Sequence, residues 1–271
     1  MKTIKYLAII TLCFYCIPVQ AISQKFKKNE FEIGGFYGIS GLLGSLKDGK
    51  ITPGLGYQFS LTDKYFFSPS FGVGLGVVYA NYSAKSELGS YSVNTPTIDD
   101  EGENFEYRIT ASGIKEEQNL SALEIPLFMA YRKKISKKFE WNGSLGIKVS
   151  LPLTATYKST DGTLETKGYY ASFNSEFSNM PNHGFEKIDK IGYSGDLTTK
   201  MAYSIFCGFG VSKPMGKVGL TIGVYGSYGL SSVLQPENNQ LVTYPLIYNS
   251  LTNLSEKTNL VSGGLKIGVR F

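Results

Sequence analysis

The sequence predicts an all-β fold, an eight-stranded antiparallel transmembrane β-barrel with short turns at one end and long loops at the other. Three observations predict it. Apolar residues recur with period two in segments of about ten or more residues separated by turn-forming clusters. The chain holds 31 Gly, 19 Tyr and 17 Phe in 271 residues, a composition rich in strand formers. Residues 22–271 contain no apolar run long enough for a membrane helix, so a crossing of the membrane must use strands.

Residues 1–21 have the pattern of a cleaved secretory signal peptide. Lys2 and Lys5 supply the positive start, residues 7–19 form an uncharged and mostly apolar run, and Val19-Gln20-Ala21 is a small-residue cleavage site. The apolar run is too short to span a bilayer as a retained anchor. We therefore expect residues 22–271 to form the mature protein as a single barrel domain.

The charge and cysteine content of residues 22–271 excludes several classes of protein. Removing Lys2 and Lys5 leaves 27 − 2 = 25 Lys and Arg against 22 Asp and Glu, a net charge of +3. The basic residues are scattered, which disfavours a nucleic-acid partner. Only Cys207 and His183 remain of their types, so an internal disulfide and a multi-thiolate metal site are excluded. We expect no catalytic, cofactor-binding or metal-binding residues.

The first four predicted strands are 31–40, 51–61, 65–82 and 119–131. Each alternates large apolar side chains with Gly, Ser or an occasional charge. Their apolar faces are, in order, Phe31, Ile33, Tyr37 and Ile39; Leu55, Tyr57, Phe59 and Leu61; Phe67, Phe71, Val73, Leu75, Val77 and Tyr79; and Leu123, Ile125, Leu127, Met129 and Tyr131.

The last four predicted strands are 139–153, 198–212, 218–230 and 259–271, and they continue the alternation. Their apolar faces are Phe139, Trp141, Leu145, Ile147, Val149, Leu151 and Leu153; Met201, Tyr203, Ile205, Cys207, Phe209 and Val211; Leu220, Ile222, Val224 and Tyr228; and Leu265, Ile267, Val269 and Phe271. A soluble barrel would instead turn its large residues inward to fill a core. The small opposite faces suit the narrow lumen of an eight-stranded membrane barrel.

The predicted connections alternate between long and short. They are 41–50, 62–64, 83–118, 132–138, 158–196, 213–217 and 231–258. In membrane barrels the short turns are periplasmic and the long loops extracellular, so both termini are expected in the periplasm. Aromatic residues near the short turns predict a periplasmic girdle made of Tyr57, Phe59, Tyr65, Phe66, Phe67, Tyr131, Phe139, Trp141 and Phe271.

Two short segments carry a resemblance to a known family. The first is Leu123-Glu124-Ile125-Pro126-Leu127 in a strand that ends at Tyr131, and the second is the terminal Gly268-Val269-Arg270-Phe271. Over residues 22–271 the chain resembles small outer-membrane barrels, OmpA-like and OmpX-like in architecture, and more closely the outer membrane protein beta-barrel domain group that includes PorT. The resemblance implies a cell outer membrane location and outer-membrane lipid around the barrel. It also implies that barrel-insertion machinery recognises the strand ending in Phe271, and it carries over no catalytic residue.

Seven charged side chains are predicted to point into the lumen: Glu32, Glu124, Glu140, Lys148, Lys200, Lys266 and Arg270. The strand pairing places Glu124 level with Lys148 and Glu32 beside the strand of Arg270. Because such a lumen is just wide enough for side chains, a lumen plugged by ion pairs is favoured. The alternative is a proton or ion path, which inward-facing Phe128, Phe206 and Tyr225 would obstruct.

The longest predicted loop is rich in aromatic residues, which need burial somewhere. They are Tyr169, Tyr170, Phe173, Phe177, Met180, His183 and Phe185. One interpretation is a cap over the barrel mouth, and the other is a contact surface for a partner or ligand. In the same loop Thr160-Asp161-Gly162-Thr163 is a hairpin signal, so strands can extend above the membrane there.

Three remaining motifs favour structural explanations. The glycines of segment 72–76 lie inside a strand with no following helix to bind phosphate. The acidic segment 99–103 lacks the ligand spacing of a calcium loop and reads as a solvated loop tip. A hydrolase built around His183 with Ser175, Ser178, Glu176 or Asp189 lacks any nucleophile pattern.

The sequence therefore predicts a non-enzymatic barrel that serves envelope structure or surface interaction through its long loops. An accessory component of a protein secretion assembly, as in PorT-like proteins, stays open, and its partners would be other envelope or secretion proteins. A small-solute channel is a further alternative, and a barrel-type lipid or peptide hydrolase is the least favoured.

Overall fold

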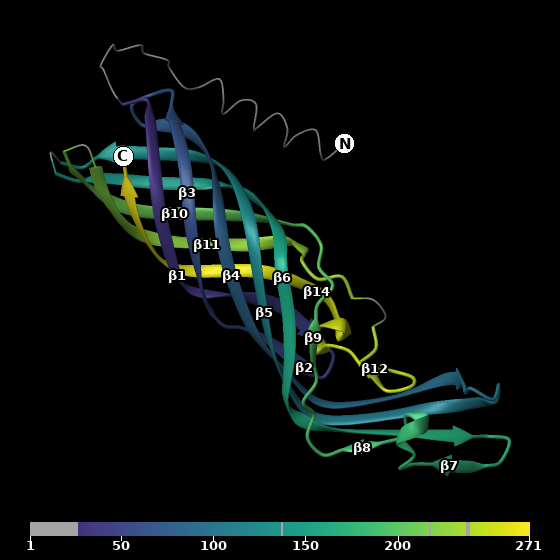
Figure 1. Ribbon diagram of the computed structural model, residues 1–271. Coiled ribbons are helices and arrows are strands. Elements are labelled where there is room, and N and C mark those ends of the chain that lie inside the picture. The colour runs from purple at the N-terminus through teal and green to yellow at the C-terminus, as the bar shows by residue number, and fades with distance from the viewer. Residues whose placement is uncertain (1–26, 137, 217, 237–238) are drawn as a thin grey trace, which may run out of the picture.

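A computed structural model describes residues 27–136, 138–216, 218–236 and 239–271 of the chain (Figure 1). The predicted signal peptide, residues 1–21, and the first residues of the predicted mature domain lie outside the described residues. Within the described ranges no helix is both long and apolar enough to cross a membrane.

Eight antiparallel strands form a closed ring, as predicted. In ring order they are β1 (Asn29–Leu46), β3 (Leu55–Phe66), β4 (Phe71–Ile98), β5 (Asn104–Lys134), β6 (Glu140–Tyr170), β10 (Ala202–Met215), β11 (Val218–Ser232) and β14 (Ser255–Arg270). The last strand, β14, pairs back onto β1 with Glu32 opposite Arg270. A short strand, β2 (Gly49–Pro53), pairs with β1 and β4 above β3. Closure leaves no open edge in the ring itself.

One predicted turn was wrong. Residues 62–64 continue β3, and the connection to β4 is at 67–70, where the hydroxyl of Ser68 accepts a hydrogen bond from the amide of Phe71 (2.9 Å). Three consecutive polar residues look like a turn, but here Thr62 and Lys64 face the polar lumen while the strand continues. The observed strand β4 thus begins at Phe71, whereas the corresponding predicted strand began at residue 65. The other two short connections, 135–139 and 216–217, lie within or beside the predicted ones.

The first three predicted long loops are largely strand. The first, 41–50, contains the end of β1, a tight turn in which Asp48 has φ 60°, and the start of β2. The second and third are shortened because β4, β5 and β6 continue far beyond the ring (Figure 1). We call residues 90–98 of β4, 104–112 of β5 and 162–170 of β6 the extended sheet. The short strands β7 (Ser175–Phe177), β8 (Lys187–Ile188) and β9 (Ser194–Asp196) pair with β6.

The extended sheet joins the barrel at a glycine-rich seam, where the chain bends (Figure 1). In β5 the buried positions from Ala130 to Ile114 are even-numbered, apart from Ser121, and those from Ala111 to Phe105 are odd-numbered. Between them lies Gly113, with φ 63°, and opposite it lies Gly162, with φ 115°. A Cβ at Gly162 would lie 2.6 Å from the Cα of Ile114, so only glycine fits there. The strand rotates at the seam, so that beyond it the odd-numbered residues of β5 are buried instead of the even-numbered ones.

Two buried clusters lie at different heights. The smaller one, Phe66, Phe128, Ala130 and Phe206, fills the lumen toward the short turns. The larger one occupies the opposite mouth and the extended sheet. It includes residues of the connection between β11 and β14, which holds β12 (Val242–Thr243), β13 (Ile247–Tyr248) and the 3-10 helix η2 (Leu251–Leu254).

The outside of the ring carries an apolar belt of exposed side chains, as the alternation predicts. Its members include Ile33, Ile39, Leu55, Leu61, Val73, Leu75, Val77, Ile125, Leu127, Leu145, Ile147, Ile205, Ile222, Val224, Leu265 and Ile267. Above the belt on β4 the outward positions become polar, from Asn81 to Glu87. An apolar outer belt around a polar, plugged interior is the arrangement of a membrane barrel.

The predicted aromatic girdle is only partly correct. Phe67, Tyr131, Trp141 and Phe271 do lie outside near the short turns, and the rings of Trp141 and Phe209 pack 4.7 Å apart there. Phe66 is buried in the lumen, because 62–66 continues β3 rather than turning. Tyr57 and Phe59 belong nearer the opposite end of β3, where Tyr57 pairs with Tyr37 and Phe59 with Tyr79. These tyrosines form part of a second aromatic band at the far border of the belt.

Candidate functional site: a plugged lumen below an extended sheet

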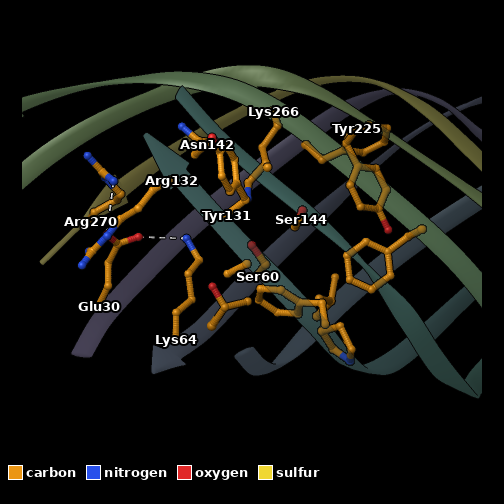
Figure 2. A pocket seen from close by; sticks show the side chains of 18 of the residues that line it. Glu30, Ser60, Lys64, Tyr131, Arg132, Asn142, Ser144, Tyr225, Lys266 and Arg270 are labelled. Carbon is orange, nitrogen blue, oxygen red and sulfur yellow. Dashed lines mark hydrogen bonds and ion pairs between the residues drawn. The ribbon is translucent and has the colours of Figure 1, made fainter. Parts of the chain in front are cut away.

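Seven charged side chains gather in the lumen near the short turns, and we call them the basal layer: Glu30, Glu32, Lys64, Arg132, Glu140, Lys266 and Arg270. Lys64 contacts both Glu32 and Glu30, the latter at 3.0 Å, and Lys266 lies 2.6 Å from Glu32. Arg270 bridges Glu30 (3.2 Å) and Glu140 (2.9 Å). Figure 2 shows Lys64, Arg132 and Arg270 converging on Glu30. Each carboxylate is thus held by at least one cation.

The basal layer contains four of the predicted lumenal charges and three that the sequence argument missed. Glu32, Glu140, Lys266 and Arg270 were predicted. Glu30 was placed before the first strand, and Lys64 and Arg132 in turns, yet β1, β3 and β5 each extend far enough to carry them inward. Lys200 was wrongly predicted to face the lumen. It precedes β10 and is exposed.

A second group, the upper layer, crosses the lumen nearer the middle of the barrel. Lys148 pairs with Glu124 at 2.7 Å, as the strand register predicted, and both side chains are at most 1% exposed. The hydroxyls of Tyr82 and Ser150 both donate to Glu124, the latter at 2.8 Å. A buried carboxylate with one cation and two hydroxyl donors is well satisfied, so the upper layer ties β4, β5 and β6 together.

Aromatic rings close the lumen between the two layers. Phe206 packs against Phe128 (5.8 Å between ring centroids) and Tyr225 (5.8 Å), and Tyr225 packs edge-on against Phe36 (5.1 Å). The remaining space is a cavity of about 70 Å³. It has room for a few water molecules, which can satisfy the buried Nε2 of Gln58 and Oγ1 of Thr62, both without a protein partner. Phe128, Phe206 and Tyr225 therefore obstruct the lumen as predicted.

The described part of the fourth loop, residues 233–236 and 239–254, closes the mouth of the barrel opposite the short turns. Leu241, Val242 and Leu251 are fully buried in the cluster that also contains barrel residues such as Leu42. Helix η2 contacts β1, β4 and β14. We call this segment the plug.

One carboxylate anchors the plug to the wall. Glu116 of β5 is 1% exposed and accepts hydrogen bonds from the Ser250 hydroxyl, the Leu251 amide (3.1 Å) and Gln118 Nε2 (2.7 Å). Burial raises the pKa of Glu116 above its usual value, and these hydrogen bonds oppose the rise without cancelling it. No described residue forms an ion pair with Glu116. The anchor is therefore a buried acid held by neutral donors.

The aromatic third loop does not cap the barrel mouth, because the plug already fills it. It packs instead on the extended sheet: Tyr170 stacks on Phe105 at 5.0 Å and Phe185 packs edge-on against Phe105 at 5.6 Å. Phe173, Phe177, Met180 and His183 remain exposed. These four side chains are thus exposed, as the alternative interpretation of the loop, a contact surface for a partner or ligand, requires.

The extended sheet has one open edge, at residues 90–98 of β4. The last pair between β2 and β4 is Gly49 with Leu88, and residues 90–98 pair with β5 alone. The amide of Asp99 donates to Glu103 (3.0 Å) at the hairpin end, so odd-numbered residues here bond to β5 and even-numbered ones face outward. Pro96, which has no amide hydrogen, accordingly faces the open side. The edge presents the backbone groups of Ser92 and Asn94.

The remaining predicted motifs occupy structural positions. Residues 72–76 lie inside β4, and 99–103 form the exposed turn between β4 and β5, where Asp99 accepts from the amides of Glu101 and Glu103. Cys207 is exposed on the outer face of β10. No group of three His, Cys, Asp or Glu side chains suited to a metal ion occurs among the residues that the structure describes.

The candidate hydrolase residues near His183 are engaged elsewhere. Glu176 is held by Arg108 (2.8 Å) and Lys167 (3.4 Å), and Asp189 by Lys187 (3.3 Å). His183 itself packs beside the ring of Phe185.

The chain has matches among protein-family models and among solved structures. No curated protein matches the sequence. Among solved structures the chain is similar to Ail, the attachment invasion locus protein of Yersinia pestis, determined with the heparin analogue sucrose octasulfate, with 12% identity over 90% of this chain and all of that one (TM-score 0.34). It is also similar to the outer membrane protein OprG from Pseudomonas aeruginosa, with 14% identity over 90% of this chain and 96% of that one (TM-score 0.39). The family model for the outer membrane protein beta-barrel domain matches residues 22–235, and the chain belongs to that family.

Proposed function

We propose that this barrel is a non-enzymatic surface-binding protein that acts through the extended sheet, not through its lumen. The observation that carries the proposal is the open edge at residues 90–98, held outside a barrel that is otherwise closed. An unpaired strand edge is a template for an extended segment of another polypeptide, whose backbone would bond to Ser92 and Asn94. The proposed partner is thus a protein that donates a strand.

The closed lumen supports binding over transport. Three successive barriers lie along it: the basal layer, the aromatic rings around Phe128 and Phe206, and the plug. A cavity of about 70 Å³ between them does not form a continuous path for solutes. The small-solute channel that the sequence left open is therefore disfavoured.

We further propose that the short turns and both termini face the periplasm, with the extended sheet outside the cell. The family's barrels have short periplasmic turns and long extracellular loops. The apolar belt would face outer-membrane lipid, and the strand ending at Phe271 would be the segment recognised by the barrel-insertion machinery. If the strand donor is another envelope protein, the barrel would act as an accessory of a larger secretion assembly; if it is external, the barrel would act in adhesion.

The test removes the donors of the open edge without disturbing β5. Because Ser92 and Asn94 turn their amides away from β5, the double variant Ser92→Pro/Asn94→Pro should keep the sheet and lose the edge. Tagged protein would be mildly crosslinked in its native envelope, and separately on cells exposed to external protein, then purified. We expect wild-type protein to retain defined partners and the proline variant to lose them.

A matched control separates backbone pairing from side-chain recognition. Ser92→Ala/Asn94→Ala keeps both amides and should keep the partners, whereas Thr95→Pro breaks the ladder to β5 and reports misfolding. A deletion of residues 171–183 removes the exposed aromatic side chains of the third loop and keeps both the edge and Phe185, which packs on Phe105. Partner recovery that survives the proline changes and disappears with this deletion would transfer the binding role to the third loop.

A further inference from the structure

Asp63 occupies an unusual position for a charged residue. It lies on the outer face of β3, exposed, within the apolar belt. Its cross-strand neighbours are Phe31 on β1 and Leu75 on β4, and the next outward residues along its own strand are Leu61 and Tyr65. No described residue forms an ion pair or a hydrogen bond with its carboxylate. The sequence argument missed this site because it placed Asp63 in a turn.

The carboxylate stands in a groove on the outside of the barrel wall. The groove measures about 400 Å³, and its apolar walls come from Phe31, Leu61, Tyr65, Val73, Val77 and Leu127. The backbone of Gly74 and Gly76 also lines it. The site is therefore an apolar groove on the outer wall that contains one negative charge.

The order of groups along the groove matches one kind of molecule. From Asp63 toward the short turns come the aromatic residues Tyr65 and Phe67, which mark the border of the belt. Away from the turns come Leu61 and Val77, toward the middle of the belt. Tyr65 is two residues from Asp63, about 7 Å along the strand, so the charge lies just inside the border. A negative charge near the border and an apolar track leading inward complement a lipid that has an ammonium group in its head and an acyl chain.

A short carboxylate in this place is unfavourable without a partner. Long Lys and Arg side chains can extend to the interface, but Asp cannot. A charged side chain on the lipid face of a barrel is destabilising, although less for Asp than for Arg or Lys. An ammonium group beside it would remove part of that cost through a charge-assisted hydrogen bond.

We propose that this groove binds an aminophospholipid of the leaflet at the short-turn end. The primary ammonium of the headgroup pairs with Asp63, and an acyl chain lies along Leu61 and Val77. A primary ammonium carries three hydrogen-bond donors, and the trimethylammonium of a choline lipid carries none. A phosphatidylglycerol head has a phosphate anion and no cation, so Asp63 repels it. The proposal does not depend on any partner of the extended sheet.

The experiment measures which lipid the barrel retains. Full-length mature protein would be equilibrated with equal amounts of phosphatidylethanolamine, phosphatidylcholine and phosphatidylglycerol of one acyl composition, and the bound lipid counted by native mass spectrometry. We expect wild-type protein to favour phosphatidylethanolamine by roughly three- to tenfold, the range of a single partly desolvated ion pair. Asp63→Asn should abolish the preference. Glu117→Gln, a carboxylate above the belt that pairs with Lys85, should leave it unchanged.

A second measurement guards against a merely structural role for the residue. In phosphatidylcholine bilayers Asp63→Leu should melt at or above the wild-type temperature, because a charge leaves the belt. Adding phosphatidylethanolamine should stabilise the wild type and not the variant. Equal lipid ratios for wild type and Asp63→Asn would overturn the proposal. So would retention of a second copy of the chain or of another protein through Asp63, since the groove would then be a protein interface.

Discussion

Glu116 of β5 and Ser250 of the plug meet across the barrel mouth, and the Ser250 hydroxyl donates its hydrogen bond to the Glu116 carboxylate. The same carboxylate accepts from the amide of Leu251, which starts helix η2. The pair links residues 134 positions apart in the chain. The carboxylate of Glu116 thus holds the plug against the barrel wall.

The first prediction is that the plug loosens as the pH rises. Burial raises the pKa of Glu116 in the plugged state above the value of about 4.5 that an exposed carboxyl has. The plugged state therefore takes up the proton more readily than the open state. Its extra stability is complete below pH 4.5 and is lost as the pH rises through the raised pKa.

Hydrogen exchange of residues 241–254 between pH 4 and pH 8, corrected for intrinsic rates, checks this prediction. Protection in the wild type should fall with pH, and in Glu116→Gln it should be independent of pH. Glu117→Gln, an exposed neighbour on the same strand, serves as the control. The same pH slope in wild type and Glu116→Gln would show that another group controls the plug.

The second prediction concerns the upper layer. Lys148→Met leaves Glu124 buried without its cation, and such a loss typically destabilises by about 3–5 kcal/mol. The double variant Lys148→Met/Glu124→Gln removes both charges and should be less destabilised than Lys148→Met alone. Denaturant unfolding in lipid bilayers measures the stabilities of the wild type, of Lys148→Met, of Glu124→Gln and of the double variant. If the effects of the two changes simply add, the pair does not interact as described.

The third prediction tests the packing of Phe128 against glycine. A Cβ at Gly74 would lie 2.4 Å from the Cζ of the Phe128 ring. Gly74→Ala should therefore destabilise the barrel by about 1–3 kcal/mol, the usual effect of overpacking, and Phe128→Leu in the same chain should restore most of the loss. Gly35→Ala has no heavy atom within 4 Å of its new Cβ and is the matched control. Equal unfolding free energies for the two alanine variants would refute the packing account.

The fourth prediction concerns the C-terminal residue. The amide of Phe271 donates to the carbonyl of Phe31 (2.8 Å), and its exposed ring lies 6.4 Å from that of Phe31. Since the ring is at the surface, Phe271→Ala should change the unfolding free energy little but slow insertion by the barrel-insertion machinery severalfold. Assembly into liposomes with and without that machinery measures both effects. Equal slowing in both liposomes would indicate a defect of folding, not of recognition.

The sequence was sufficient for the ring because the apolar belt repeats on every strand. Period-two alternation identifies eight strands, and the pairing of Glu124 with Lys148 follows from the turn between their strands. The prediction from the sequence failed where polar residues of a strand face the lumen. Thr62, Asp63 and Lys64 have turn-like composition, yet two of them face a polar interior and the third faces the groove outside.

The extended sheet could not be predicted from the belt, because above the membrane the outside of the sheet is polar. There the buried residues alternate with charged ones, as in Phe105, Tyr107 and Ile109, and the phase changes at Gly113 and Gly162. A scan for alternation with either phase would have found these strands. The plug could not be found in this way, since its burial depends on a contact between Glu116 and residues far along the chain.

Single-channel recording of the wild-type protein in planar bilayers tests the central claim most directly, that the lumen is closed and the binding surface lies outside it. We predict no steady conductance, either for the wild type or for a variant lacking residues 241–254, because the aromatic rings and the basal layer remain in both. A steady wild-type current whose ion selectivity reverses with Lys64→Glu would contradict the account, since ions would then pass through the basal layer.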